Sequence, residues 1–338
     1  MKLEDIFTFE HLYEAHMHCR RYKQHKGEVI RFEMNLSVNL MNLVQALQRR
    51  TYQLGAYKSF YICEPKKRLI EALPYKDRVV VYCFCKYSLR SHIEKRLIYD
   101  NVACREGKGT MFAIRRFEQF LKREYLREGN ATVYFLKCDI RKFFASIDHQ
   151  VLFQQLAKLD FSDNEMWMIQ TVISQQDHGA KKGLPLGNQT SQWFALFYLN
   201  RIDRLVKETL RVKHYIRYMD DMILLHRDKT YLQFCLKQIE AVCQNELHLE
   251  LNQKTQIGKA TNGVDFLGFR HILTKKGKVI RNLRTSSRIR MQRHVKKLNV
   301  LENCGIVSQD YVEKRKMAFG VYLKDSDESQ SFQDKITS

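Results

Sequence analysis

Two adjacent carboxylates, Asp220 and Asp221, lie between apolar runs in the stretch YIRYMDDMILL at residues 215–225. The aromatic and β-branched content of both flanks predicts two short buried strands. Buried strands seldom carry two neighbouring acids, because an unpaired buried carboxylate is costly. The pair is therefore expected either at a solvated hairpin tip or at a cation site, since carboxylate oxygens suit hard ions such as Mg2+.

A metal site needs a third carboxylate, and Asp139 is the best candidate. It ends a second apolar run, VYFLKCD at residues 133–139. A structural role would suit Asp139 alone, but one acid at a strand end and two in a neighbouring hairpin can share a pair of metal ions. Taken with Asp220 and Asp221, Asp139 favours a catalytic site. Asp148 is instead expected to cap the helix that starts near His149.

The charge of the chain points to a polyanionic partner. The 338 residues carry a formal net charge of +21, which favours nucleic acid, with a basic membrane-surface protein as the competing interpretation. We find no apolar run long enough to span a bilayer and no strongly amphipathic basic helix, so no membrane partner is expected. The first residues lack a signal-peptide pattern, and a cytoplasmic location is the expectation.

The pattern of elements predicts a mixed fold. Helices are expected at residues 36–50, 77–98, 111–126, 149–175, 191–210 and 232–247, with a basic helix from Ser286 onward. Strands and hairpins are expected at residues 57–62, at 66–73 between Pro65 and Pro74, at 264–269 and around 276–277, and residues 325–331 read as a frayed polar tail. Strands and helices in this order favour an α+β fold over a doubly wound parallel sheet.

Three motifs in order resemble a known superfamily. The YMDD stretch, the upstream Asp139 with Phe143 and Phe144, and the LPLG loop at residues 184–187 resemble a reverse transcriptase over residues 63–268. The resemblance implies a right-hand polymerase with fingers, palm and helical thumb. Its expected boundaries are fingers with an N-terminal extension at 1–131, palm at 132–272 with a fingers insertion at about 149–183, and thumb with a polar tail at 273–338.

A narrower resemblance rests on the LPLG loop. Most relatives carry Gln at the position of Leu186, and here Ser191 and Gln192 follow. These residues, with segments at 64–70, 76–78 and 103–110, resemble the reverse transcriptases of diversity-generating retroelements, within the group II intron-like bacterial superfamily. Because Leu cannot hydrogen-bond near the nascent base pair, base discrimination is expected to loosen. The resemblance implies misincorporation opposite template adenines.

The wider resemblance also implies metal and nucleotide roles. Asp139, Asp220 and Asp221, with the Ile140 carbonyl, would hold two Mg2+ ions. The implied dNTP-binding residues are Lys66, Arg68, Phe144, Leu186 and Lys254. Lys66 and Arg68 would contact the triphosphate, Phe144 would be the steric gate against a 2′-hydroxyl, and Lys254 would lie near the pyrophosphate. Taken alone, these positions suit equally a solvated basic turn, a core phenylalanine and a surface lysine.

Two further segments are expected to contact nucleic acid. Phe266, Leu267 and Gly268 resemble a primer grip. Arg288, Arg293 and Lys297, in the basic helix, are expected to contact a duplex backbone rather than form a merely solvated face. Beyond about residue 300 the resemblance weakens, because AFGVY at residues 318–322 stands where the family often has a Gly-His pair.

The resemblance implies an RNA-directed DNA polymerase that copies a template-repeat RNA into cDNA for mutagenic retrohoming. Its expected partners are template RNA, a primer or cDNA strand, dNTPs and a small basic helical accessory protein, and it is expected to be encoded by a bacterium or a phage. The alternatives are another bacterial reverse transcriptase, from a phage-defence or retron-like element, and a noncatalytic RNA-binding protein on a polymerase scaffold. The intact acids argue against the last of these.

Overall fold

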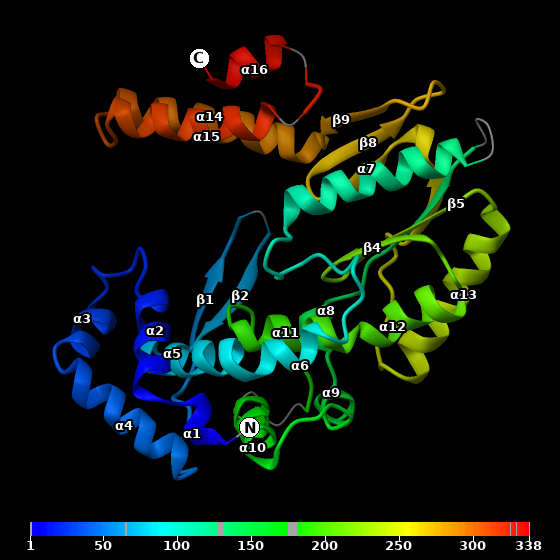
Figure 1. Ribbon diagram of the computed structural model, residues 1–338. Coiled ribbons are helices and arrows are strands. Elements are labelled where there is room, and N and C mark those ends of the chain that lie inside the picture. Colours follow the sequence, from blue (N-terminus) through cyan, green and yellow to red (C-terminus); the bar gives the residue numbers. More distant parts are fainter. Residues whose placement is uncertain are drawn as a thin grey trace.

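The computed structural model describes residues 2–64, 66–127, 132–174, 181–324, 326–328 and 330–337. Helices and three small sheets make up this part of the chain (Figure 1), and every pairing between its named strands is antiparallel. The expected α+β class is therefore confirmed. Helices α1–α4 (blue) lie on the side of the molecule opposite the C-terminal helices α14–α16 (orange to red).

The central sheet has the strand order β4-β5-β3-β6. Its strands are β3 Tyr134–Cys138, β4 His214–Tyr218, β5 Asp221–His226 and β6 Gln256–Lys259. Leu136 and Leu224 pack on helix α13 Lys229–Asn245, while Phe135 and Leu225 pack on helix α7 Thr110–Leu126. The sheet is therefore covered on both faces, and its free ends are where polar groups can reach solvent.

A second sheet follows, and it corrects one expectation. Its strands are β7 Val264–Phe266, β8 Phe269–Leu273 and β9 Val279–Leu283, preceded by the 3-10 helix η3 Ala260–Asn262. A single strand over residues 264–269 was the wrong prediction. Leu267 and Gly268 have φ of 48° and 90°, and two positive values in sequence make a tight hairpin turn between β7 and β8. The expected hairpin around Gly277 is confirmed between β8 and β9.

Helices at the N-terminal side surround a long helix. The elements are α1 Leu3–Ile6, α2 Phe9–Cys19, α3 Gly27–Glu33, α4 Leu36–Gln48, α5 Tyr75–Phe84, the π-helix η1 Cys85–Leu89 and α6 Arg90–Glu94. The helix expected over 77–98 exists, with a π-helical turn in its middle, and ends earlier. A hairpin within residues 66–73 was the wrong prediction: the segment forms one strand, β2 Arg68–Ala72, which pairs with the expected strand β1 Lys58–Ile62. Pro65, expected at its boundary, lies outside the described residues.

The helices between β3 and β4 correct a second expectation. They are α8 Phe143–Ser146, α9 His149–Leu156, α10 Asp163–Ser174, α11 Gln189–Tyr198, α12 Asn200–Arg204 and the π-helix η2 Leu205–Thr209. One helix over 149–175 was the wrong prediction, and residue 175 lies outside the described residues. The Ser162 amide donates to Glu165 Oε2 at 2.9 Å and the Glu165 amide to Ser162 Oγ at 3.4 Å. This capping box starts a new helix.

The expected cap at Asp148 is confirmed. Its Oδ1 accepts hydrogen bonds from the amides of Gln150 at 3.0 Å and Val151 at 3.2 Å. The carboxylate therefore satisfies two amides that the first turn of α9 would otherwise leave without partners.

The C-terminal segment corrects a third expectation. Helices α14 Thr285–Asn303, α15 Gln309–Lys324 and α16 Gln330–Thr337 form the upper layer in Figure 1. The tail was expected to fray; residues 325 and 329 of that stretch lie outside the described residues. Phe332 and Ile336 are buried in a cluster with Met291, and Glu328 Oε1 accepts from the Leu283 amide at 2.8 Å. Apolar burial and strand contacts thus hold α16 in place.

Across the described residues, no helix combines the length and the apolar character that crossing a membrane requires.

We expect Phe332→Ala to destabilise the protein by about 3 kcal/mol, because it deletes a buried aromatic side chain from the cluster that docks α16. Urea unfolding followed by circular dichroism measures the change. Gln330→Ala, an exposed position on the same helix, is the matched control and should stay within about 0.5 kcal/mol of wild type. Equal stability of both variants would mean that the tail is frayed after all.

Candidate active site

The acid pair lies in the tight turn between β4 and β5. Tyr218 pairs with Asp221 in the register of the two strands, so Met219 and Asp220 form the two-residue turn. Met219 has φ of 55°, a conformation that costs energy for a residue with a side chain. The backbone of this turn must therefore be held by surrounding contacts.

Asp139 lies beside this turn. It follows β3 directly, and β3 is antiparallel to β5 with Cys138 opposite Met222. Continuing the register by one residue places Asp139 next to Asp221. The structure thus brings together the three carboxylates that the sequence singled out, at one end of the central sheet.

The two acids of the turn have raised pKa values. Burial and, to a smaller extent, the negative charges of Asp139 and Asp221 together raise the pKa of Asp220 from 3.8 to about 6, against an opposing backbone hydrogen bond. Burial also raises the pKa of Asp221, while the cation of Lys137 opposes the rise. A cation that binds beside a carboxylate with a pKa raised in this way stabilises its charged form.

Lys137 is a residue of this site that the sequence analysis missed. Its Nζ donates to Asp221 Oδ2 at 2.9 Å and to the Asp265 carbonyl at 2.6 Å. Lys137 precedes Asp139 by two residues in a strand, and residues two apart share one face. That spacing was the available signal, because a lysine within a buried run needs an acid nearby.

The acids offer suitable donors for a metal ion. Within the described residues, no group of three or more His, Cys, Asp or Glu side chains is placed so that it could hold a metal ion. Asp221 Oδ1, however, is buried and has no hydrogen-bond partner. The negative charges of Asp139 and Asp221 also raise the pKa of Asp220. Carboxylate oxygens in this setting fit a hard divalent cation.

The loop at residues 183–187 joins the acid site to the β1–β2 hairpin. The Leu184 amide donates to the Phe144 carbonyl at 2.7 Å, and the Glu71 amide donates to the Leu186 carbonyl at 3.2 Å. Gly187 has φ of 117°, and a Cβ there would lie 3.2 Å from Ile70 Cγ2. The close approach of loop and hairpin therefore depends on glycine.

Three of the expected dNTP-binding residues lie around this loop. Phe144 is half-buried on α8, five residues after Asp139, with its ring against Phe143. Lys66 and Arg68 are exposed on the hairpin that contacts Leu186. The structure thus connects Phe144, Leu186 and the hairpin cations through the loop.

Lys254 is also placed near the acids by backbone contacts. The Asn252 amide donates to the Asp139 carbonyl at 2.7 Å, and Asn252 Oδ1 accepts from the Lys254 amide at 3.1 Å. Ile140 forms a bridge with Leu251 in the same segment. The Lys254 side chain is exposed.

The expected primer-grip residues form the β7–β8 turn. Phe266 is buried, and the Gly268 carbonyl accepts from the Arg284 amide at 3.0 Å. A Cβ at Gly268 would lie 2.8 Å from Tyr322 Oη. Because Lys137 binds the Asp265 carbonyl, this turn is connected to the acid site on one side and to the C-terminal helices on the other.

The basic residues of α14 divide into two kinds. Arg293 and Lys297 are exposed and one turn apart, so they share a face. Arg288 lies 3.5 Å from Glu328 Oε2 and 4.2 Å from the centre of the Phe332 ring. Its guanidinium is therefore engaged by the C-terminal segment.

Comparison with known families decides the class of protein. The family model described as reverse transcriptase (RNA-dependent DNA polymerase) matches residues 64–271, more than half of the chain. The chain belongs to the reverse transcriptase family. The matched region contains all three acids, the LPLG loop and the β7–β8 turn. Members of this family normally use divalent metals, in keeping with the carboxylate site.

Solved structures support the fold of this reverse transcriptase. Telomerase from Candida albicans, solved with a TWJ fragment of telomeric RNA, is 16% identical with a TM-score of 0.52 over 84% of this chain. Apo telomerase from Candida tropicalis, truncated from its C-terminal domain, is 14% identical with a TM-score of 0.51 over 70% of this chain. The matches span 57% and 58% of those telomerase chains. Among curated proteins, none matches the chain.

The raised pKa of Asp220 predicts a stability gain from Asp220→Asn in EDTA. A carboxyl whose folded pKa of about 6 exceeds its ordinary 3.8 stabilises the fold when protonated, and that contribution is lost as pH rises through 6. At pH 7.5 the neutral amide should therefore add about 3 kcal/mol. The gain should shrink below pH 6 and vanish near pH 4.

Thermal melts of both proteins across this pH range measure the gain. Asp160→Asn, which changes an exposed acid, is the control and should have no effect. A loss of stability in Asp220→Asn at pH 7.5 would contradict the crowding of charges that the structure shows.

Proposed function

We propose that this reverse transcriptase copies RNA into DNA by a two-metal mechanism, with Asp139, Asp220, Asp221 and the Ile140 carbonyl holding two Mg2+ ions. The observation that carries the proposal is the meeting of three carboxylates from two strands at one end of the central sheet. When bound, the ions would activate the primer 3′-hydroxyl and neutralise the charge that develops on the transferred phosphoryl group.

The protein groups divide the remaining tasks by chemistry and place. Arg68 and Lys66 on the β1–β2 hairpin bind the triphosphate, since guanidinium and ammonium groups pair with phosphate oxygens. Phe144 lies under the sugar and excludes a 2′-hydroxyl. Lys254 meets the leaving pyrophosphate. Their shared connection to Asp139 and to the loop of Leu186 supports this assignment.

The nucleic acid is held on the other side of the acids. Phe266, Leu267 and Gly268 grip the primer end, and the Lys137 contact to Asp265 supports a fixed distance between grip and acids. Arg293 and Lys297 bind the duplex backbone, with Arg288 contributing less because Glu328 engages it. We assign fingers to residues 1–131, palm to 132–272 and thumb to 273–338. Template RNA, primer or cDNA and dNTPs are the proposed partners.

Within the family we propose a diversity-generating retroelement enzyme that acts in a bacterial or phage-infected cytoplasm with a small basic helical accessory protein. Leu186 supports this proposal, because its side chain offers no hydrogen bond to the nascent pair. The Ser191 and Gln192 pair at the start of α11 supports it too. An adjacent pair of near-identical DNA repeats that differ at adenines would support the retroelement; its absence would favour a phage-defence or retron-like enzyme.

Primer extension tests the polymerase. On a poly-rA template with an oligo-dT primer and Mg2+, we expect the wild type to synthesise DNA and Asp220→Ala to lose at least about a thousandfold of the rate, because a metal ligand is removed. Asp160→Ala, at an exposed acid, should retain the full rate. No synthesis by the wild type, even with native RNA and accessory protein supplied, would favour an RNA-binding protein without polymerase activity.

Leu186→Gln tests the retroelement assignment. The amide restores a hydrogen bond near the nascent pair, so errors opposite template adenine should fall by roughly fivefold, the factor for one hydrogen bond of about 1 kcal/mol. Sequencing of cDNA from both forms on one template measures the error rate at each base. Leu126→Gln, an exposed leucine outside the site, is the matched control, and an unchanged adenine error rate in Leu186→Gln would refute the assignment.

A further inference from the structure

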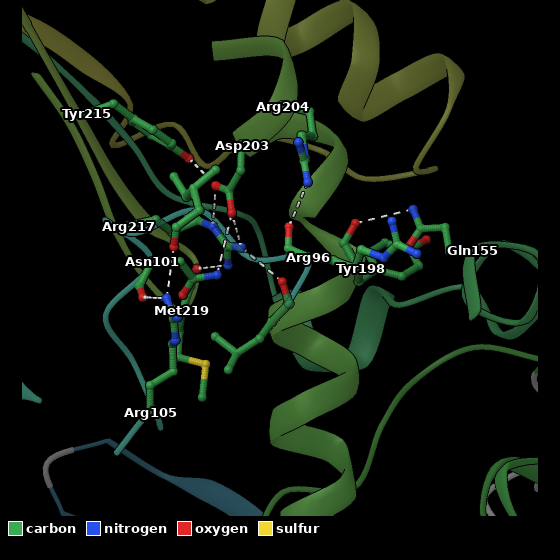
Figure 2. A network of polar contacts seen from close by, with 12 residues as sticks. Arg96, Asn101, Arg105, Gln155, Tyr198, Asp203, Arg204, Tyr215, Arg217 and Met219 are labelled. Carbon is green, nitrogen blue, oxygen red and sulfur yellow. Dashed lines mark hydrogen bonds and ion pairs between the residues drawn. The ribbon is translucent and has the colours of Figure 1, made fainter. Parts of the chain in front are cut away.

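A fully buried guanidinium lies directly behind the acid turn. Arg217, in β4, has 0% side-chain exposure, as does its counter-ion Asp203 in α12. Figure 2 shows the two side chains facing one another. Arg217 Nε lies 2.7 Å from Asp203 Oδ1, and Nη2 lies 2.6 Å from Asp203 Oδ2. This is a two-pronged ion pair, the strongest geometry available to arginine and carboxylate.

The remaining donors of Arg217 reach two backbone carbonyls. Nη1 donates to the Met219 carbonyl at 2.9 Å, and Nη2 also donates to the Leu196 carbonyl at 2.9 Å. The Met219 carbonyl belongs to the peptide that joins Met219 to Asp220. Met219 has the costly positive φ noted above, so the guanidinium binds the turn at its strained peptide.

Arg217 is itself held from several directions. Its amide donates to the Asp100 carbonyl at 3.0 Å, and its carbonyl accepts from the Val102 amide at 3.0 Å. Asp203 additionally accepts from Tyr215 Oη at 2.7 Å and from Asn101 Nδ2 at 3.4 Å. Both the backbone and the counter-ion of Arg217 are therefore fixed, and the guanidinium has little freedom to follow a shift of the turn.

A buried ion pair of this kind is a poor source of stability, because desolvation offsets the attraction between the charges. Apolar residues of similar volume often serve the fold as well. What apolar residues cannot supply is a donor for the Met219 carbonyl. Arg217 makes contacts with α11, α12 and the acid turn at once, a set that the single ammonium of lysine cannot match.

We propose that Arg217, oriented by Asp203, is a positioning residue that fixes the Met219–Asp220 peptide and so the direction of Asp220 toward the metal ions and the primer end. The inference rests on the proposed polymerase activity. Through Leu196 the same guanidinium fixes α11, which begins directly after the Leu186 loop.

The proposal predicts different effects on kcat and on the KM for dNTP. Loss of the Arg217 contact displaces Asp220 slightly, and displacements near 1 Å cost on the order of a hundredfold in rate. The KM for dNTP should change little, since the triphosphate contacts lie on the β1–β2 hairpin. Affinity for Mn2+ in the protein alone should weaken, because one ligand is no longer held in place.

The decisive variant replaces the network by apolar groups: Arg217→Met with Asp203→Leu and Tyr215→Phe. It removes both charges together, so no buried charge is left unpaired. Thermal melts report folding, isothermal titration with Mn2+ reports metal affinity, and steady-state primer extension separates kcat from KM. Tyr215→Phe alone is the matched control, since it removes a partner of Asp203 without touching the Met219 carbonyl.

Three results for a folded triple variant together support positioning: kcat reduced about a hundredfold, a KM for dNTP within about threefold of wild type, and weakened Mn2+ binding. Tyr215→Phe alone should behave as wild type. A folded triple variant with wild-type kcat and Mn2+ affinity overturns it. Should the triple variant not fold, Arg217→Lys decides: an unchanged kcat per folded molecule overturns the proposal, and a reduced one supports it. If the wild type makes no DNA, the polymerase proposal fails, and Mn2+ affinity alone decides positioning.

Discussion

Three carboxylates that repel one another meet at the end of the central sheet, and the surrounding structure is what keeps them there. The β3–β5 register places Asp139 beside Asp221, and a turn with a positive φ at Met219 places Asp220 between the strands. Burial raises the pKa of Asp220 and of Asp221. A site of this kind lowers the stability of the fold and favours the binding of cations. Functional sites commonly give up stability for function in this way.

The same end of the sheet collects contacts from segments far apart in the chain. The LPLG loop bonds to α8 behind Asp139 and to β2 of the hairpin. The β7–β8 turn is joined to the acids through Lys137 and to α15 through the close approach of Gly268 and Tyr322. Movement of the hairpin or of the C-terminal helices would therefore shift the positions of the acids, because short paths of hydrogen bonds and packed groups connect them.

The sequence predicted the acids and their strands well, because strand ends, apolar runs and adjacent carboxylates are local signals. The Ser162 and Glu165 capping box is also a local signal, and it divides the apolar pattern of residues 149–175 into two helices. Arg217 was beyond such reasoning: it lies in an apolar run, and its partners depend on register and on helices packed from elsewhere. The docking of α16 likewise depends on a cluster formed by Met291 and strand residues that no local pattern reveals.

The two cations at the acids differ in a way that suits different tasks. The Lys137 side chain keeps 18% exposure and presents a compact ammonium on a flexible stem to Asp221, so it can neutralise that acid and yield to a stronger cation. Arg217 has no exposure and every arm of its planar fork has a partner, so it cannot yield without breaking several contacts. A point charge that can be displaced belongs beside a metal ligand, and a rigid fork belongs behind the peptide that must not move.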